Sequence, residues 1–286
     1  MKTLYLSDLD GTLINSDQRI SPYTAGVIND FVDAGGYFSY ATARSIVTSS
    51  KVAAGFNARL PVICANGAFI LDPSTREILV GRYFAQADID FAREIITEHG
   101  LFPHVFTYID NTERLLIFKH EFSTGFQNFL DERKGDPRFI WLDSPSQLYQ
   151  GNIFAFHYIN EKSKLEALHE AFGASQKFYT VFQKDVYSDD SYLEIMPKDS
   201  TKATAALELK KMLGCDRLVV FGDGLNDMPM FEVADESYAM ANAHPELKSI
   251  ATAVIDSNTD DGVAKWINAH GIKSHNLGDN QNEFCK

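Results

Sequence analysis

The sequence predicts an α/β fold in which a parallel sheet, covered by helices on both faces, is interrupted by an inserted α+β domain. Strand and helix patterns alternate over residues 1–81 and again over residues 199–286, as they do in parallel sheets. Over residues 82–198, helical patterns interleave with aromatic-rich strand patterns instead. The length of 286 residues also allows two modest domains. We therefore expect one domain made from both ends of the chain and a second made from its middle.

The expected elements follow from apolar periodicity and from turn residues. In the first region they are strands at 3–6, 37–41, 61–64 and 68–71, and helices at 24–34 and near 45–54. In the insert they are helices at 88–99, 122–133 and 162–172, and strands at 105–109, 115–119, 153–159, 178–182 and 192–196. In the last region they are helices at 200–213, 228–234 and 261–269, and strands at 218–221 and 253–255.

Composition restricts the classes of partner and location. The formal net charge of −13 argues against binding to nucleic acid, whose partners carry basic patches. No apolar run approaches the roughly 20 residues that span a bilayer, so we expect no membrane segment. The three cysteines, Cys64, Cys215 and Cys285, show no CxxC spacing and predict free thiols in a reducing compartment. We expect a cytoplasmic protein with a small-molecule partner.

Two carboxylates follow the first strand. Asp8 and Asp10 are two positions apart, so continued strand pairing would place both on one face. Neighbouring carboxylates repel each other, and a divalent cation with oxygen ligands would relieve that repulsion. The alternative is a polar strand end that turns into a loop, which Asp and Gly favour in any case.

A second acidic segment, Gly222-Asp-Gly-Leu-Asn-Asp227, follows the strand at 218–221. Glycines on both sides of Asp223 indicate a close backbone approach to a bound group. Ligands bind at the carboxyl ends of strands in open α/β sheets, where Asp223 would join the first acidic pair. Asp227 or Asn226 could instead serve as the N-cap of the next helix.

Two further positions fit a phosphate site. Asp199 or Ser200 would cap a helix and place Lys202 in its first turn, where a lysine opposes the helix dipole but favours a bound anion. The alternative for Lys202 is an exposed, solubilising side chain. Thr42 ends a strand, and its hydroxyl could bond a phosphate oxygen or simply cap the helix that follows.

These segments together resemble the four motifs of the haloacid dehalogenase superfamily of phosphohydrolases. Asp8-Leu-Asp10-Gly-Thr12 resembles its first motif, DxDG[TS], and Gly222–Asp227 resembles the fourth, GDxxND. Thr42 and Lys202 stand at the second and third motifs. The insert between the second and third motifs resembles the large cap domain of the Cof-type branch, on a Rossmann-like core. Ala43 and Ala203 depart from this branch, which often has Gly at both positions.

The resemblance implies a role for each motif residue. Asp8 would be the nucleophile and Asp10 the general acid/base, while Thr42 and Lys202 would hold the phosphoryl oxygens. Mg²⁺ would be bound by the Asp8 side chain, the Asp10 carbonyl and Asp223, with Asp227 supporting the metal site. The other residues expected at the phosphate are Ala43, Arg44, Asn66 and Asn226, although Asn66-Gly67 is also typical of an ordinary turn.

The implied activity is Mg²⁺-dependent hydrolysis of a small phosphorylated metabolite through an aspartyl-phosphate. Sugar phosphates, pyridoxal phosphate and flavin mononucleotide are the candidate substrates, and the cap at 82–198 would select among them. Two alternatives remain open. One is a phosphomutase or phosphotransferase that returns the phosphoryl group to a sugar, and the other is a non-catalytic sensor of a phosphorylated ligand.

Overall fold

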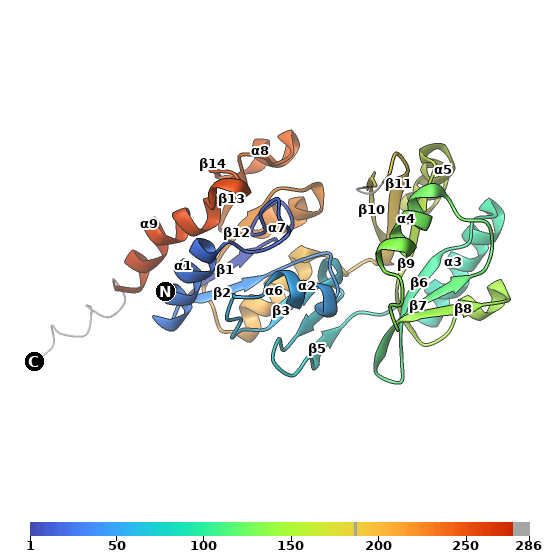
Figure 1. The fold of residues 1–286 in the computed structure, drawn as a ribbon, viewed down its shortest axis with the longest axis horizontal. Helices are drawn as coiled ribbons and strands as arrows, with labels where there is room; N and C mark the ends of the chain where they lie inside the picture. Colours follow the sequence, from blue (N-terminus) through green and yellow to red (C-terminus); the bar gives the residue numbers. More distant parts are fainter. Residues whose placement is uncertain (186–187, 277–286) are drawn as a thin grey trace, which may run out of the picture. The chain divides into compact units, whose positions relative to one another are not determined.

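The computed structural model describes residues 1–185 and 188–276 (Figure 1). The chain divides into two compact units, one formed by residues 1–81 with the segment from 201 onward, and the other by residues 82–200. The predicted fold class is confirmed, because a parallel sheet belongs to the first unit and a mixed sheet with its own helices belongs to the second. Of the three cysteines, Cys64 and Cys215 are free thiols, and Cys285 lies outside the described residues.

A five-stranded parallel sheet forms the centre of the first unit, in the order β14-β13-β12-β1-β2. Its strands are β1 Thr3–Ser7, β2 Tyr37–Tyr40, β12 Arg217–Gly222, β13 Glu236–Met240 and β14 Ala253–Ile255. β1 pairs with β12, so that Leu6 lies opposite Val220. Segments from the first and last regions of the chain therefore meet in the middle of the sheet, and the acidic segments after β1 and β12 lie side by side.

Helices cover both faces of this sheet (Figure 1). They are α1 Pro22–Asp33, α2 Ile46–Val52, α6 Lys202–Met212, α7 Met228–Val233, α8 Pro245–Ile250 and α9 Gly262–Asn276. The ring of Tyr5 on β1 packs against Phe31 of α1 and Trp266 of α9, so these helices share one face. Leu4 and Leu6 point to the opposite face and are fully buried, and α6 contacts β12.

A small antiparallel sheet adjoins the parallel one. It consists of β3 Val62–Cys64, β4 Phe69–Leu71 and β5 Ile78–Gly81, and the bridge between Ala41 and Ile63 links it to the chain after β2. The segments at 61–64 and 68–71 are thus strands, as expected, but they do not extend the parallel sheet. The turn between them is the buried 3₁₀ helix η1 Ala65–Gly67, rather than an exposed surface turn.

The second unit is a six-stranded sheet in the order β10-β11-β9-β6-β7-β8, with only β7 and β8 parallel to each other. Its strands are β6 His104–Ile109, β7 Thr112–Phe118, β8 Phe139–Leu142, β9 Asn152–Asn160, β10 Phe178–Lys184 and β11 Ser191–Pro197. Its helices are α3 Gln86–His99, α4 Thr124–Glu132 and α5 Lys162–Ser175. Alternating residues of β7 join two different cores, Leu116 with α3 and α5, and Leu115 and Ile117 with α4.

Four regular elements were not expected from the sequence, namely β5, β8, β13 and α8. The short 3₁₀ helices η2 Pro145–Leu148, η3 Leu225–Asp227 and η4 Asn258–Asp260 complete the described structure. Among the described residues, no helix is long and apolar enough to cross a membrane.

Candidate active site

The site lies at the carboxyl ends of β1 and β12. Asp8 follows β1 directly, and its N–H donates to Phe221 O at 2.9 Å, which continues the pairing of the two strands by one residue. Carboxylate oxygens of Asp8, Asp223 and Asp227 lie within 4.8 Å of one another. No second group of potential metal-binding side chains of this size occurs among the described residues. The structure therefore brings together the three carboxylates that were expected at the metal site, where Asp10 was expected only through its carbonyl.

Lys202 Nζ lies between two of these carboxylates. It donates to Asp8 Oδ1 and to Asp227 Oδ1, both at 2.6 Å, and its side chain is completely buried. The lysine is the first residue of α6, whose N-cap is Thr201, with Thr204 N–H donating to its hydroxyl at 3.0 Å. The expected caps at Asp199 or Ser200 were wrong by one or two residues, and an exposed solubilising role for Lys202 is excluded by its burial.

Asp227 anchors the loop after β12. Its Oδ2 accepts hydrogen bonds from the N–H groups of Asp223 and Gly224, both at 3.0 Å, while its Oδ1 accepts from Lys202. Asp227 stands at the N-cap position of α7, but its side chain makes no capping bond to that helix. Its carboxylate instead binds the loop backbone and Lys202, and these hydrogen bonds hold Asp223 in place.

Asp223 is in turn held by the loop after β1. Thr12 Oγ1 donates to Asp223 Oδ1 at 2.9 Å. Gly11 has a φ of +72°, and a Cβ there would lie 2.2 Å from Asp223 Oδ2. Only glycine fits this position, because it accepts the left-handed conformation and leaves room for the carboxylate.

The charges of the site are not balanced by the protein alone. Burial raises the pKa of Asp8 well above its usual value, although the Lys202 ammonium acts in the other direction. Burial and the Asp227 carboxylate together raise the pKa of Asp223 to about 7. Burial acts to lower the pKa of Lys202, but the carboxylates of Asp227 and Asp8 outweigh it and raise that pKa. The three clustered carboxylates, which share a single ammonium, are a set of oxygen ligands that fits a hard divalent cation.

Asp10 is not part of this cluster. Strand β1 ends at Ser7, so Asp8 and Asp10 do not continue the alternation of a strand. The Asp10 side chain is 48% exposed and is held by Arg44, whose Nε and Nη2 donate to its two oxygens at 2.8 and 2.6 Å. The acidic cluster therefore unites Asp8 with Asp223 and Asp227, and Asp10 faces a guanidinium.

Thr42 lies in the loop after β2, beside the site. Its side chain is buried, its N–H donates to Ile63 O at 2.9 Å, and its hydroxyl accepts from Arg44 N–H at 3.1 Å. The following helix, α2, is capped by Ser45 and not by Thr42. Ala43 is not among the described residues with positive φ, so alanine fits this position without backbone strain.

Asn66 and Asn226 meet across the site. Asn226 Nδ2 donates to Asn66 Oδ1 at 3.1 Å, and Asn66 N–H donates to Thr42 O at 3.0 Å. Gly67, with a φ of +101°, lies against the start of α6, since a Cβ there would be 2.1 Å from Thr201 O. The segment at 65–67 thus ties the loop after β2 to the helix that carries Lys202.

Two contacts of the site were not found by sequence reasoning. Gln18 Oε1 accepts from Arg44 Nη2 at 3.1 Å, and Asn242 Nδ2 donates to Gly11 O at 2.8 Å. Gln18 carries no sequence pattern that would have revealed it. Asn242 follows β13, a strand that was itself not expected from the sequence.

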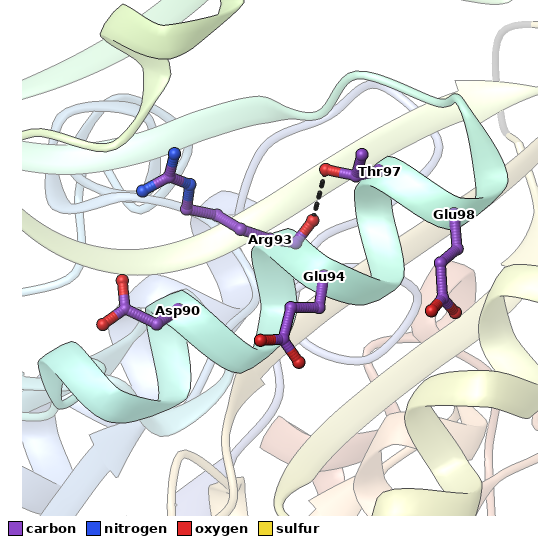
Figure 2. A pocket seen from close by; sticks show the side chains of 5 residues that line it. All are labelled: Asp90, Arg93, Glu94, Thr97 and Glu98. Carbon is purple, nitrogen blue, oxygen red and sulfur yellow. Dashed lines mark hydrogen bonds between the residues drawn. The ribbon is translucent and has the colours of Figure 1, made fainter.

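A surface pocket elsewhere has different chemistry. Figure 2 shows its lining side chains, which come from successive turns of α3 in the second unit: Asp90, Arg93, Glu94, Thr97 and Glu98. Thr97 donates to Arg93 O at 2.6 Å, within the helix itself. Three carboxylates against one guanidinium would repel a phosphorylated ligand. This pocket is therefore no alternative to the site at β1 and β12.

Comparison with known proteins assigns the chain to a family. Residues 5–267 match the family of haloacid dehalogenase-like hydrolases. The chain belongs to this family. The resemblance inferred from the four motifs is confirmed, and so is the prediction that the protein is a hydrolase of a family with phosphatases among its members.

This hydrolase is similar along almost its whole length to proteins named as phosphatases and to a solved structure. It is 28% identical to 5-amino-6-(5-phospho-D-ribitylamino)uracil phosphatase YwtE of Bacillus subtilis, covering 91% of this chain and 95% of that one. It is 24% identical to pyridoxal phosphate phosphatase YbhA of Escherichia coli, covering 93% and 97%. Among solved structures, TM0651 of Thermotoga maritima superposes with a TM-score of 0.73 at 25% identity, covering 94% and 97%.

Proposed function

We propose that this hydrolase is a Mg²⁺-dependent phosphatase that cleaves small phosphorylated metabolites through an aspartyl-phosphate. The observation that carries the proposal is the position of Asp8, which contacts Lys202 at 2.6 Å and adjoins the carboxylates of Asp223 and Asp227. A carboxylate can attack phosphorus when nearby positive charge stabilises the phosphoryl oxygens. The phosphatases named above, which this chain matches over more than nine-tenths of its length, support the same reaction class.

In the first step, an Asp8 carboxylate oxygen attacks phosphorus while the bond between phosphorus and the ester oxygen breaks. Asp10, in its protonated form, gives its proton to the departing oxygen, which leaves as an alcohol. In the second step, water attacks phosphorus, Asp10 takes a proton from that water, and Asp8 leaves as a free carboxylate. Lys202 and Thr42 hold the phosphoryl oxygens, with Asn66 and Asn226 beside them.

The metal would be held by the Asp8 and Asp223 carboxylates and the Asp10 carbonyl, with Asp227 keeping Asp223 oriented through its bonds to the loop. When bound, a divalent cation supplies positive charge that offsets these carboxylates and the phosphoryl oxygens. This assignment fits the buried, crowded carboxylates, whose charge a single lysine does not balance.

The substrate belongs to the class of small phosphate monoesters, and sugar phosphates, pyridoxal phosphate and flavin mononucleotide are the first to test. We assign catalysis to the unit formed by residues 1–81 and 201 onward. Substrate selection belongs to the unit of residues 82–200, as expected of a cap domain. We place the enzyme in the cytoplasm, acting on metabolites and not on nucleic acid or membranes.

The test is phosphate release from a panel of phosphorylated metabolites and p-nitrophenyl phosphate, with Mg²⁺ present. We expect hydrolysis by the wild type and loss of activity on addition of EDTA and in Asp8→Asn. The matched control is Asp256→Asn, which removes an exposed carboxylate paired with Lys265 at 3.0 Å and should leave the rate unchanged. Equal activity in wild type and Asp8→Asn, or no activity on the whole panel, would overturn the proposal.

A further inference from the structure

Arg44 is bound to the Asp10 carboxylate in a two-pronged contact. Its Nε donates to Asp10 Oδ2 at 2.8 Å and its Nη2 donates to Asp10 Oδ1 at 2.6 Å. The sequence suggested a different partner, since Arg44 was expected to bind phosphate. A planar guanidinium matched to both oxygens of a carboxylate fixes the plane of that carboxylate as well as its position.

Arg44 is itself held by two further hydrogen bonds, one from its backbone and one from its guanidinium. Arg44 N–H donates to Thr42 Oγ1 at 3.1 Å, which anchors its backbone beside the end of β2. Nη2 also donates to Gln18 Oε1 at 3.1 Å. Gln18 has a positive φ, and its N–H donates to Asn15 O at 3.1 Å, which closes a turn. The arginine therefore connects two ordered loops to one carboxylate.

Asp10 needs such support because nothing else in the site restrains its side chain to the same degree. It lies beyond the end of β1, and its side chain is 48% exposed, whereas that of Asp8 is 7% exposed. A proton donor must lie within hydrogen-bond reach of the oxygen it protonates, so rotation of an exposed carboxyl lowers the fraction of productive encounters.

We propose that Arg44 is a positioning residue for Asp10, which orients the carboxyl group that exchanges a proton with the ester oxygen and with water. This inference rests on the proposed function and assigns Arg44 to the proton-transfer step instead of phosphate binding. The chemistry is that of the two steps above. The proton moves from Asp10 to the ester oxygen as the bond to phosphorus breaks, and Arg44 exchanges no atoms or electrons.

The two assignments of Arg44 differ in how its loss depends on the leaving group. An alkyl phosphate releases a strongly basic alkoxide and needs the proton from Asp10, whereas p-nitrophenyl phosphate releases a weakly basic phenolate and needs it much less. Loss of a positioning residue lowers kcat/KM, which reports on formation of the aspartyl-phosphate, chiefly for the alkyl ester. Loss of a phosphate ligand raises KM or lowers kcat/KM for both esters to a similar extent.

The experiment compares wild type, Arg44→Ala, Arg44→Lys, Asp10→Asn and the double variant of Arg44→Ala with Asp10→Asn. Each is assayed with p-nitrophenyl phosphate and with the alkyl phosphate of the panel that the wild type hydrolyses fastest. We expect Arg44→Ala to lower kcat/KM about 10- to 100-fold for the alkyl ester and less than about 3-fold for the aryl ester. Arg44→Lys, which keeps the charge but not the two-pronged geometry, should restore only part of the rate.

The double variant tests whether Arg44 acts through Asp10. Because no carboxyl group remains to be oriented, adding Arg44→Ala to Asp10→Asn should change the alkyl-ester rate less than about 2-fold. Arg59→Ala is the matched control, since it removes an exposed arginine paired with Asp33 in the same unit and should leave both rates unchanged.

Three results would overturn the inference. Additive losses in the double variant, or equal losses on both esters, would return Arg44 to phosphate binding, and no loss in Arg44→Ala would remove it from the reaction. In each of these cases the wild type is active and the proposed function stands. A wild type that releases phosphate from neither ester would overturn the proposed function and this inference together.

Discussion

Lys202 and Asp227 form an ion pair of 2.6 Å in which both side chains are fully shielded from solvent. Few ionic pairs are buried so completely, because removing two charges from water costs more than an isolated pair recovers. Here the pair is supported by Asp8, which takes a second hydrogen bond from the ammonium, and by two backbone N–H groups on Asp227. The ammonium is thus both a structural link between α6 and the loop after β12 and the nearest cation to Asp8.

Lys202→Met should destabilise the first unit and abolish activity. The change leaves Asp8 and Asp227 buried without their cation, and removing one partner of a buried pair costs about 3–5 kcal/mol. Urea unfolding at pH 7.5 measures the loss. The control is Lys210→Met on the same helix, which breaks a more exposed pair with Asp235 at 3.2 Å and should cost less than about 1 kcal/mol. Equal costs for the two variants would contradict this account.

Gly67→Ala should displace the start of α6 and with it Lys202. The residue has a φ of +101°, and its Cβ would lie 2.1 Å from Thr201 O, a backbone atom that cannot move alone. Gly214 is the matched control, since its φ is +62° but no atom lies within 4 Å of a Cβ there. Gly214→Ala should cost about 1–2 kcal/mol of backbone strain. Gly67→Ala should cost clearly more in thermal unfolding and lower kcat, and equal stability of the two variants would refute this.

The sequence was sufficient to predict the fold class because both signals behind it are local. Short apolar strands, buried on both faces, alternate with helices of period 3.6 in the first and last regions, and acidic residues follow β1 and β12. The rule that parallel strands present their carboxyl ends at one edge then brings Asp8 close to Asp223. The structure agrees with that step, since their carboxylates belong to one cluster.

What escaped prediction depends on contacts between distant segments. β13 has the sequence Glu-Ser-Tyr-Ala-Met and no apolar run, and it forms a strand because β12 and β14 pair with it on both sides. The contact between Arg44 and Asp10 joins residues 34 positions apart, and no rule of sequence spacing predicts which carboxylate a guanidinium binds. The burial of Asn66 follows likewise from the packing of η1 against α6.

Mg²⁺ should stabilise the protein more at high pH than at low pH. Without a cation, the pKa of Asp223 is about 7 in the folded protein against 3.8 when unperturbed, so the folded form retains a proton that the unfolded form has lost. That contribution to stability is present below pH 4 and is lost as the pH rises through 7. A bound cation would displace the proton and compensate for the loss.

Thermal unfolding with and without Mg²⁺ at pH 6 and pH 8, at constant ionic strength, measures this effect. At a Mg²⁺ concentration of about 100 times Kd the stabilisation reaches about 2.7 kcal/mol, and at pH 6 it should be smaller because protons compete for the site. Asp223→Asn should remove most of the effect at both pH values. An increase in Tm that is the same at pH 6 and pH 8 would show that protons and metal do not share these carboxylates.

The stability of the second unit should decrease as the pH falls, opposite to the effect of Asp223, because of His157 on β9. The side chain is 2% exposed, lies opposite His104 of β6 and Glu194 of β11, and its Nδ1 has no hydrogen-bond partner among the described residues. Burial, together with the charge of Arg133, lowers the pKa of His157 to about 3. The unfolded chain therefore binds a proton below about pH 6.5 that the folded unit does not, and stability falls as the pH decreases from 6.5 toward 3.

His157→Phe should make the second unit less sensitive to acid. Phenylalanine suits a site where the ring of His157 already packs against Phe106, Phe129 and Tyr192, and it cannot be protonated. Acidification from neutral pH to pH 5.5 lowers the wild-type free energy of unfolding by about 1.4 kcal/mol through this histidine. The free energy of unfolding of the variant should therefore fall by that much less. Amide hydrogen exchange of β9 at pH 7.5 and 5.5, converted to opening free energies, reports on this unit alone. His120→Phe, at an exposed position of the same unit, is the control and should keep the wild-type pH dependence. If His157→Phe keeps it as well, burial of this imidazole is not what couples the second unit to pH.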